Sequence, residues 1–317
     1  MLTTPMTEIL QIKHPIQCGT MQGLSRPEFV AAVAETGGLA CLAAAIFETP
    51  EGLQKAIEQT RKLTDQPFGV NVSLFPALSP SPPEEMIQAL IDSGITILET
   101  AGRSPEPYRQ TIMEAGLIHI HKCARVRDAV KVDAMGVDLI SVVGTECGGH
   151  PSMEGVTSLV LIPRVLESVG KPVIAGGGFS GGRTLTAALA LGAAGVNMGT
   201  RFMASRECPI HETAKQTLLD AAETDSVLVM QSLKNPLRSL RTPWTEKILE
   251  LEARGAGLEE LLPYISGESS RTGWIAGNIE QGIFPAGQVM GCLHTIPSLA
   301  ELMQDILNEA ELAKESI

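Results

Sequence analysis

Eight short apolar segments of β type recur along the first two thirds of the chain, and each ends in glycine or polar residues. In order they are PIQCG (15–19), LACLAAA (39–45), FGVNVSL (68–74), ILETAG (97–102), LIHIHKC (117–123), LISVVG (139–144), PVIAGGG (172–178) and GVNMGTRF (195–202). Several are apolar throughout rather than alternating. That pattern is typical of strands that are buried on both faces of a sheet.

Helical patterns fill the intervals between these segments, as at 49–63 and 182–191, and a glycine follows several of them. Glycine is the usual residue just past a helix end, because it adopts the left-handed conformation there. Strands that recur about every 20 to 30 residues, with a helix between them, are typical of parallel βα units. Eight such units predict an α/β fold, a TIM (β/α)8 barrel. The alternative is an open, doubly wound sheet.

The alternation of strand and helix stops after the eighth segment. Residues 208–279 carry polar helical patterns, at 209–223 and 245–254, and no clear parallel strand. An apolar helical pattern then returns near the end of the chain. We therefore predict a barrel formed by residues 1–207 and 280–317, with a smaller, mostly helical domain inserted at 208–279. Because the insertion follows the eighth strand, we expect it to form a lid over the active-site end of the barrel.

The balance of charge and the cysteine pattern exclude several classes of partner. The chain has 24 Lys and Arg against 36 Asp and Glu, a net charge of −12, so we expect no nucleic-acid partner. No apolar run approaches the ~20 residues that cross a bilayer, and no secretory signal pattern begins the chain. The six cysteines are scattered without a CxxC pair, which argues against a zinc site. We expect a cytoplasmic protein with neither a membrane partner nor a metal.

Two glycine-rich turns stand where a barrel commonly binds phosphate. The seventh segment ends in Gly176, Gly177 and Gly178, and the eighth is followed by Gly199 and Thr200. Active sites of TIM barrels lie at the carboxyl ends of the strands, with phosphate between the loops after strands 7 and 8. Glycine lets free backbone N–H groups approach the anion closely. Tight turns would explain either loop alone, but the two together favour a site for a sugar phosphate or for FMN.

Two ionisable side chains are expected at the same end. Lys122 ends the fifth strand among apolar residues, so its ammonium could face an anion or form a Schiff base. The simpler alternative is a lysine that reaches solvent at the barrel rim. His150 follows Gly148 and Gly149 in the loop after the sixth strand, where a neutral imidazole could take a proton from a carbon acid. A solvent-facing loop histidine is the alternative there.

Two further histidines on the fifth strand have a different expected role. His119 and His121 alternate with Ile118 and Ile120. They therefore share one face of the strand, and Lys122 lies on the other. We expect them to be hydrogen-bonded structural residues.

Several motifs taken together resemble the nitronate monooxygenase (2-nitropropane dioxygenase) family, including its NAD(P)H:quinone reductase-like branch. They are PIQCGTMQG (15–23), HKC (121–123), GTECGGHPS (144–152), PVIAGGGF (172–179), NMGTRF (197–202) and GIFPAGQVMG (282–291). The motifs follow the family's order and span nearly the whole chain. The resemblance implies an FMN-containing TIM barrel with a helical second domain. The family also includes flavin-dependent enoyl-acyl carrier protein reductases.

The resemblance also implies a role for each matching residue. His150 would be the catalytic histidine beside the flavin, and Lys122 would sit by the flavin ring. The other residues implied to flank or contact the ring system are Thr20, Met21, Gln22, Asn71, Ser73 and Gly148. The residues implied to hold the FMN phosphate are Gly176, Gly178, Gly199 and Thr200.

Three functional hypotheses follow. In the first, an FMN-dependent enzyme oxidises a nitronate or nitroalkane with O2, and His150 positions the nitronate or takes the α-proton. In the second, NAD(P)H reduces the FMN and a quinone collects the electrons. In the third, a flavin-free barrel binds a sugar phosphate and uses Lys122 as a Schiff base. The sequence leaves the oligomeric state open.

Overall fold

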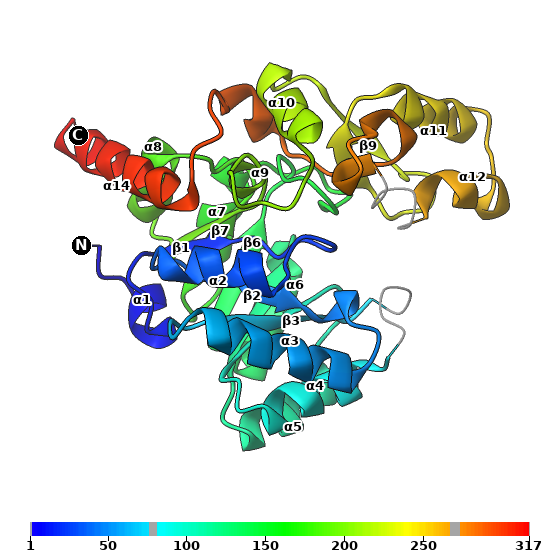
Figure 1. The fold of residues 1–317 in the computed structure, drawn as a ribbon. Helices are drawn as coiled ribbons and strands as arrows, with labels where there is room; N and C mark the ends of the chain where they lie inside the picture. Colours follow the sequence, from blue (N-terminus) through cyan, green and yellow to red (C-terminus); the bar gives the residue numbers. More distant parts are fainter. Residues whose placement is uncertain (1, 76–80, 267–272, 317) are drawn as a thin grey trace.

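Eight parallel strands form the centre of the computed structural model, which describes residues 2–75, 81–266 and 273–316 (Figure 1). Their bounds are β1 (Ile16–Cys18), β2 (Cys41–Ala43), β3 (Gly69–Ser73), β4 (Ile97–Ala101), β5 (Ile118–Cys123), β6 (Leu139–Val143), β7 (Val173–Gly176) and β8 (Gly195–Met198). In the sheet β1 pairs with β8, and the order of neighbouring strands then continues as β7, β6, β5, β4, β3 and β2. A parallel bridge between Gln17 and Leu39 joins these two ends. The predicted TIM barrel is confirmed, and each strand lies within one of the eight apolar segments.

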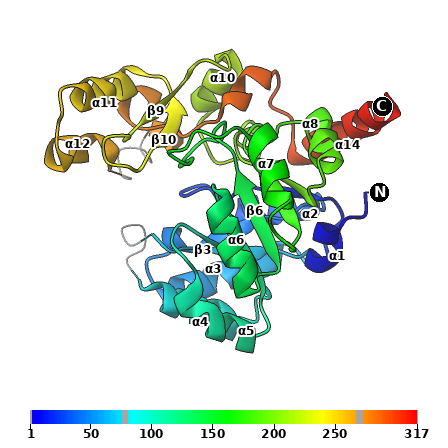
Figure 2. The same cartoon turned by 180° about the vertical axis from the view of Figure 1, so that it is seen from behind.

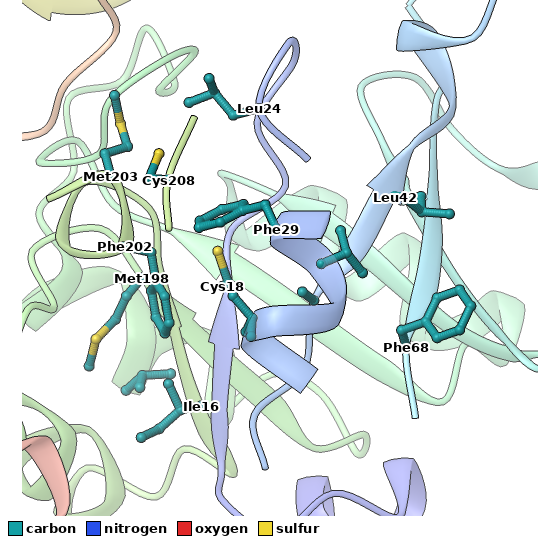
Figure 3. Packing of buried hydrophobic residues seen from close by; sticks show 14 of the residues in the cluster. Ile16, Cys18, Leu24, Phe29, Leu42, Phe68, Met198, Phe202, Met203 and Cys208 are labelled. Atoms are coloured by element: carbon teal, nitrogen blue, oxygen red, sulfur yellow. The ribbon is translucent and has the colours of Figure 1, made fainter. Parts of the chain in front are cut away.

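Helices cover the outside of the barrel, as the two opposite views show (Figures 1 and 2). They are α2 (Pro27–Glu35), α3 (Pro50–Leu63), α4 (Pro83–Asp92), α5 (Arg109–Glu114), α6 (Val126–Met135), α7 (Ser158–Leu166) and α8 (Gly182–Ala190). Local sequence sets several of their ends. Thr49 accepts a bond from the N–H of Gly52 at the start of α3, and Gly136 ends α6 with a φ of 84°. Phe29 of α2 lies with Cys18 of β1 in one buried apolar cluster (Figure 3).

A short helix closes the amino end of the barrel. In α1 (Pro5–Leu10), the side chains of Met6 and Leu10 are buried. They pack against Leu39, which precedes β2, and against apolar residues of the strands, namely Cys41, Ile97, Ile120, Leu139 and Ile174. A Cβ on Gly195 would lie 2.4 Å from the Met6 sulfur, so this close packing requires a glycine. The amino end of the interior is therefore filled with hydrocarbon.

The segment after β8 leaves the barrel and contains both helices and strands. It comprises α9 (Thr200–Met203), α10 (Glu212–Asp220), β9 (Ser226–Val229), β10 (Leu237–Leu240), α11 (Pro243–Ala253) and α12 (Leu258–Ile265). The sequence did not indicate the antiparallel pair of β9 and β10. Strands of four residues are too short to display a clear period. The loop between them contains Met230 and Lys234 at positive φ, without a glycine to mark the turn.

The C-terminal helix α14 (Leu299–Glu315) returns to the barrel and packs along α8 (Figure 1). A Cβ on Gly182 would lie 2.2 Å from the backbone nitrogen of Ala310, so the two helices approach at a glycine. Short 3₁₀ helices are η1 (Ala44–Ile46), η2 (Glu106–Tyr108), η3 (Ile279–Gln281) and η4 (Gln288–Cys292). Among the described residues, no helix is long and apolar enough to cross a membrane.

Candidate active site

The loop that carries His150 is held by both the barrel and the segment 208–279. Gly149 N donates to Arg238 O at 3.1 Å, and Arg238 N donates to Gly149 O at 2.6 Å. The Arg238 side chain donates from Nε to Thr145 O at 2.9 Å and from Nη1 to Ser226 Oγ at 2.8 Å. Its guanidinium is therefore satisfied by groups of the loop and of β9. Strand β10 fixes the backbone next to His150.

The same loop packs against a later part of the chain. A Cβ on Gly148 would lie 2.8 Å from the carbonyl carbon of Ala286 and from the nitrogen of Gly287. Gly287 N in turn donates to the Thr200 hydroxyl at 2.9 Å. One packed unit is therefore formed by the loop after β6, the start of α9 and residues 286–287. Position 148 requires glycine because a side chain there would collide with the backbone of residues 286–287.

His150 is exposed to solvent at the carboxyl end of the barrel. Surrounding protein still removes part of its hydration, and this desolvation lowers the pKa of the imidazole below its ordinary 6.5. The ring is therefore neutral at pH 7 and can accept a proton. Burial acts in the opposite sense on the neighbouring Cys147 and raises the pKa of its thiol to about 12. Cys147 is consequently a thiol at neutral pH, which does not suit a nucleophile.

A buried carboxylate, Glu99, lies among polar side chains inside the barrel. Its Oε2 accepts from Gln17 Nε2 at 2.7 Å. Its Oε1 accepts from Thr20 Oγ1 at 2.8 Å, from Asn71 Nδ2 at 2.7 Å and from Lys122 Nζ at 3.3 Å. Burial raises the pKa of Glu99, but the Lys122 ammonium and the three neutral donors outweigh it and hold the pKa below its usual value. Glu99 is therefore an anion.

The structure thus brings three of the predicted site residues, Thr20, Asn71 and Lys122, around one carboxylate. The Lys122 side chain is 19% exposed, so it also reaches the mouth of the barrel. The other residues predicted near a flavin ring lie close by in the chain: Met21 and Gln22 follow β1, and Ser73 ends β3. All are at the carboxyl ends of strands.

The predicted phosphate loops contain free donors. Gly178 has a φ of 83°, and the three atoms nearest to a Cβ there would belong to the Glu146 side chain, at 3.7 Å. A Cβ on Gly199 would have no atom within 4 Å. Within the described part of the chain, the N–H groups of Gly178 and Gly199 donate to no acceptor. Two unpaired donors on two glycines, with open space beside Gly199, fit a phosphate group.

Gly176 and the start of α8 are engaged in other contacts. A Cβ on Gly176 would lie 2.6 Å from Val143 Cγ1, so this glycine serves packing inside the barrel. At the start of α8, Gly182 N donates to Glu309 Oε2 of α14 at 2.5 Å. The chain's own carboxylate therefore occupies that helix N-terminus. The open donors lie at Gly178 and Gly199 instead.

The prediction for the two histidines on the other face of β5 is confirmed. Thr100 Oγ1 lies 2.7 Å from His119 Nε2 and 2.8 Å from His121 Nδ1. Burial lowers the pKa of His119 to about 3 and that of His121 to about 4. Both rings are buried and neutral, and they face the helical layer. In the described residues no group of three or more His, Cys, Asp or Glu side chains could hold a metal ion.

Sequence reasoning missed Glu99 and Arg238, for different reasons. Glu99 is a charged residue in a strand that is otherwise largely apolar, on the same face as Ile97 and Ala101. That pattern predicts a buried ion pair, and it was the available signal. Arg238 has no such signal, because its partners lie 93 and 12 residues away.

A cavity of about 350 Å³ opens at the other end of β5, between α5 and α6. Some of the polar groups along it are hydrogen-bonded to one another. Arg109 Nε donates to Met135 O at 2.6 Å, and Asp138 Oδ2 accepts from His119 N at 2.8 Å. This cavity lies at the amino end of β5, whereas Lys122 lies at the carboxyl end of that strand.

Comparisons with known proteins identify the family of the chain. A family model described as nitronate monooxygenase matches residues 3–309. The (3aS,4S,5R,7aS)-5-hydroxy-7a-methyl-1-oxo-octahydro-1H-indene-4-carboxyl-CoA dehydrogenase of Mycobacterium tuberculosis is 32% identical, over 98% of this chain and 96% of its own. A probable nitronate monooxygenase of Staphylococcus saprophyticus is 27% identical, over 79% of this chain and 82% of its own.

Among solved structures, FabK from Thermotoga maritima is 35% identical with a TM-score of 0.91 and covers 100% of this chain and 98% of that one. The chain therefore belongs to the nitronate monooxygenase family. It is an enzyme, a flavin-dependent oxidoreductase built on a TIM barrel.

Proposed function

We propose that this family member is an FMN-dependent oxidoreductase in which His150 exchanges a proton with a substrate carbon next to an electron-withdrawing group. The observation that carries the proposal is the neutral His150 imidazole, exposed at the carboxyl end of the barrel on a loop fixed by Arg238. A neutral imidazole is suited to accept such a proton near pH 7.

The residues at this end fit FMN. Lys122, Thr20 and Asn71 offer polar groups from the barrel interior, with Met21, Gln22, Ser73 and Gly148 around the mouth. The unpaired N–H groups of Gly178 and Gly199 suit a monoester phosphate, with Gly176 and Thr200 completing the two loops. When bound, FMN supplies the hydride and electron transfer that side chains lack.

The chain's own residues supply orientation and charge. The ammonium of Lys122, whose charge Glu99 partly offsets, would stabilise negative charge that develops on a reduced flavin. Residues 208–279, our predicted lid domain, place Arg238 against the loop of His150. A substrate bound beside His150 would lie next to β10, which holds the loop of His150 in place.

A coenzyme A thioester is the substrate class that we favour. The carboxyl-CoA dehydrogenase matches this chain from end to end, whereas the nitronate monooxygenase matches about four fifths of it. In an acyl thioester, the carbon next to the carbonyl is acidic enough to exchange a proton with an imidazole that is suitably placed.

Nitronate oxidation with O2 is the second candidate, supported by the family match over residues 3–309. The same histidine would take the α-proton of a nitroalkane or position the preformed nitronate. Both candidates use a carbon acid at one site, so a single set of measurements separates them.

The test is anaerobic mixing of the purified, FMN-loaded protein with NADH, NADPH, crotonyl-CoA and ethyl nitronate, with flavin absorbance as the readout. Reduction by NADH or NADPH followed by reoxidation with crotonyl-CoA supports the thioester. Direct bleaching by ethyl nitronate supports the second candidate, and reoxidation by a quinone alone supports neither. A protein that does not take up FMN would overturn the proposal.

A further inference from the structure

The Glu99–Lys122 ion pair inside the barrel has no part in the proton transfer proposed above. The Lys122 Nζ to Glu99 Oε1 distance is 3.3 Å, and the Glu99 side chain is 0% exposed. Keeping a carboxylate ionised in such a place is costly unless several donors surround it. Such a residue is expected to serve a purpose beyond stability.

The donors to Glu99 come from four places in the fold: β1, the loop after β1, β3 and β5. An ionised carboxylate only accepts hydrogen bonds, so each donor is held in one orientation by it. Gln17 shows how strongly the carboxylate fixes the orientation of a donor. Its Nε2 is turned to Glu99, and its buried Oε1 is left without a partner in the described structure.

Three of these donors, Thr20, Asn71 and Lys122, are those proposed to face the flavin ring. We infer that Glu99 is a positioning residue that orients this trio and offsets the Lys122 charge, so that a bound flavin meets a nearly neutral pair. The inference rests on the proposed function. Because a lone cation favours the negatively charged reduced flavin, the carboxylate should lower the flavin reduction potential.

The experiment uses the full chain loaded with FMN and three variants: Glu99→Gln, Lys122→Met and the double variant. Glu99→Gln leaves the ammonium unopposed, so the midpoint potential should rise by about 30 mV, which is a tenfold change for a two-electron couple. Lys122→Met leaves the carboxylate unopposed, so the potential should fall by a similar amount. The double variant should return near the wild-type value.

The pH dependence sharpens the test. In Lys122→Met the buried carboxylate has lost its cation, so it should take up a proton as the pH falls. The difference in midpoint potential between Lys122→Met and the wild type should therefore become smaller toward low pH. The difference between Glu99→Gln and the wild type should not. A purely structural role would weaken FMN binding in all three variants without opposite shifts of potential.

Apoprotein titrated with FMN, followed by the loss of flavin fluorescence, separates the possible failures. If the wild type does not bind FMN, the proposed function fails. If it binds and Glu99→Gln shows no positive shift, the role of Glu99 is overturned alone. Should Glu99→Gln not fold, the double variant is compared with Lys122→Met. Removing the carboxylate should then raise the potential, and an unchanged value would overturn the inference.

Discussion

The two ends of the barrel interior are built from different side chains. At the amino end, Met6 of α1 packs against Ile97, Ile120 and Ile174, with no polar atom among them. Two residues further along β4 and β5, the interior holds Glu99 and Lys122. The amino end gains stability from hydrocarbon burial, which requires no orientation of charge. The carboxyl end contains charge in fixed directions, which is what a flavin and an ionisable substrate require.

The difference teaches that a single strand can contribute hydrocarbon to the core at one end and an oriented charge at the other. Inward-facing residues on β4 change from Ile97 to Glu99 within one pleat repeat. Substitutions at the two ends should therefore separate stability from chemistry, and the following predictions test this from the largest effect to the smallest.

His150→Ala should cause the largest change at the carboxyl end. Because general-base contributions are typically ~10² to 10⁴-fold, turnover of a substrate that must lose a proton should fall by that amount. Turnover of a preformed nitronate should fall far less. The matched control is His294→Ala, an exposed histidine, which should leave steady-state rates unchanged. Equal losses with both kinds of substrate would contradict a proton-transfer role.

Ile174→Ala should act at the amino end and on stability alone. The side chain is fully buried, so its truncation should lower the free energy of unfolding by about 2–5 kcal/mol. Urea denaturation measures the loss, and FMN titration of the folded variant should give the wild-type dissociation constant. A strong loss of FMN affinity would show that the two ends are not separable.

Acid should lower stability through the two buried histidines. Their pKa values are about 3 for His119 and about 4 for His121, whereas an unfolded histidine has a pKa of about 6.5. Between the folded and the unfolded pKa, the unfolded state therefore binds more protons than the folded state. As the pH falls below about 6.5, each should reduce the free energy of unfolding by up to ~1.4 kcal/mol per pH unit.

The variant His121→Gln isolates this contribution. Urea denaturation at pH 7, 6 and 5 should show a shallower decline than in the wild type, since one titrating group is gone. Identical slopes would mean that His121 is accessible to protons in the folded state.

Gly199→Ala should cause the smallest effect, and only at the carboxyl end. No atom lies within 4 Å of the added Cβ and the φ of Gly199 is negative, so the apoprotein should fold normally. The methyl group would narrow the path to the open N–H, and FMN should bind about tenfold more weakly, or ~1.4 kcal/mol. Gly170→Ala is the control, because that glycine also has open space but lies away from the site.

Several features of the site could be predicted from the sequence because they are local. Lys122 lies at the carboxyl end of β5 and His150 in the loop after β6, and the rule that strand ends converge predicts both at one end of the barrel. The partners of these residues could not be predicted in the same way. Lys122 and Glu99 are 23 residues apart, and Arg238 lies 93 residues from Thr145 in the loop of His150.

The sequence by itself determined the eight strands and their parallel order, and it predicted the end of the barrel at which the site should lie. Apolar runs and regularly spaced glycines are patterns within a few neighbouring residues, so they can be recognised in the sequence without knowledge of the fold. Only the tertiary structure decided that Glu99 is an anion among four donors, that Arg238 fixes the loop of His150 and that Glu309 occupies the start of α8. Those contacts depend on how a closed barrel aligns distant segments, because hydrogen bonds and ion pairs form only between groups that the register brings within about 3 Å.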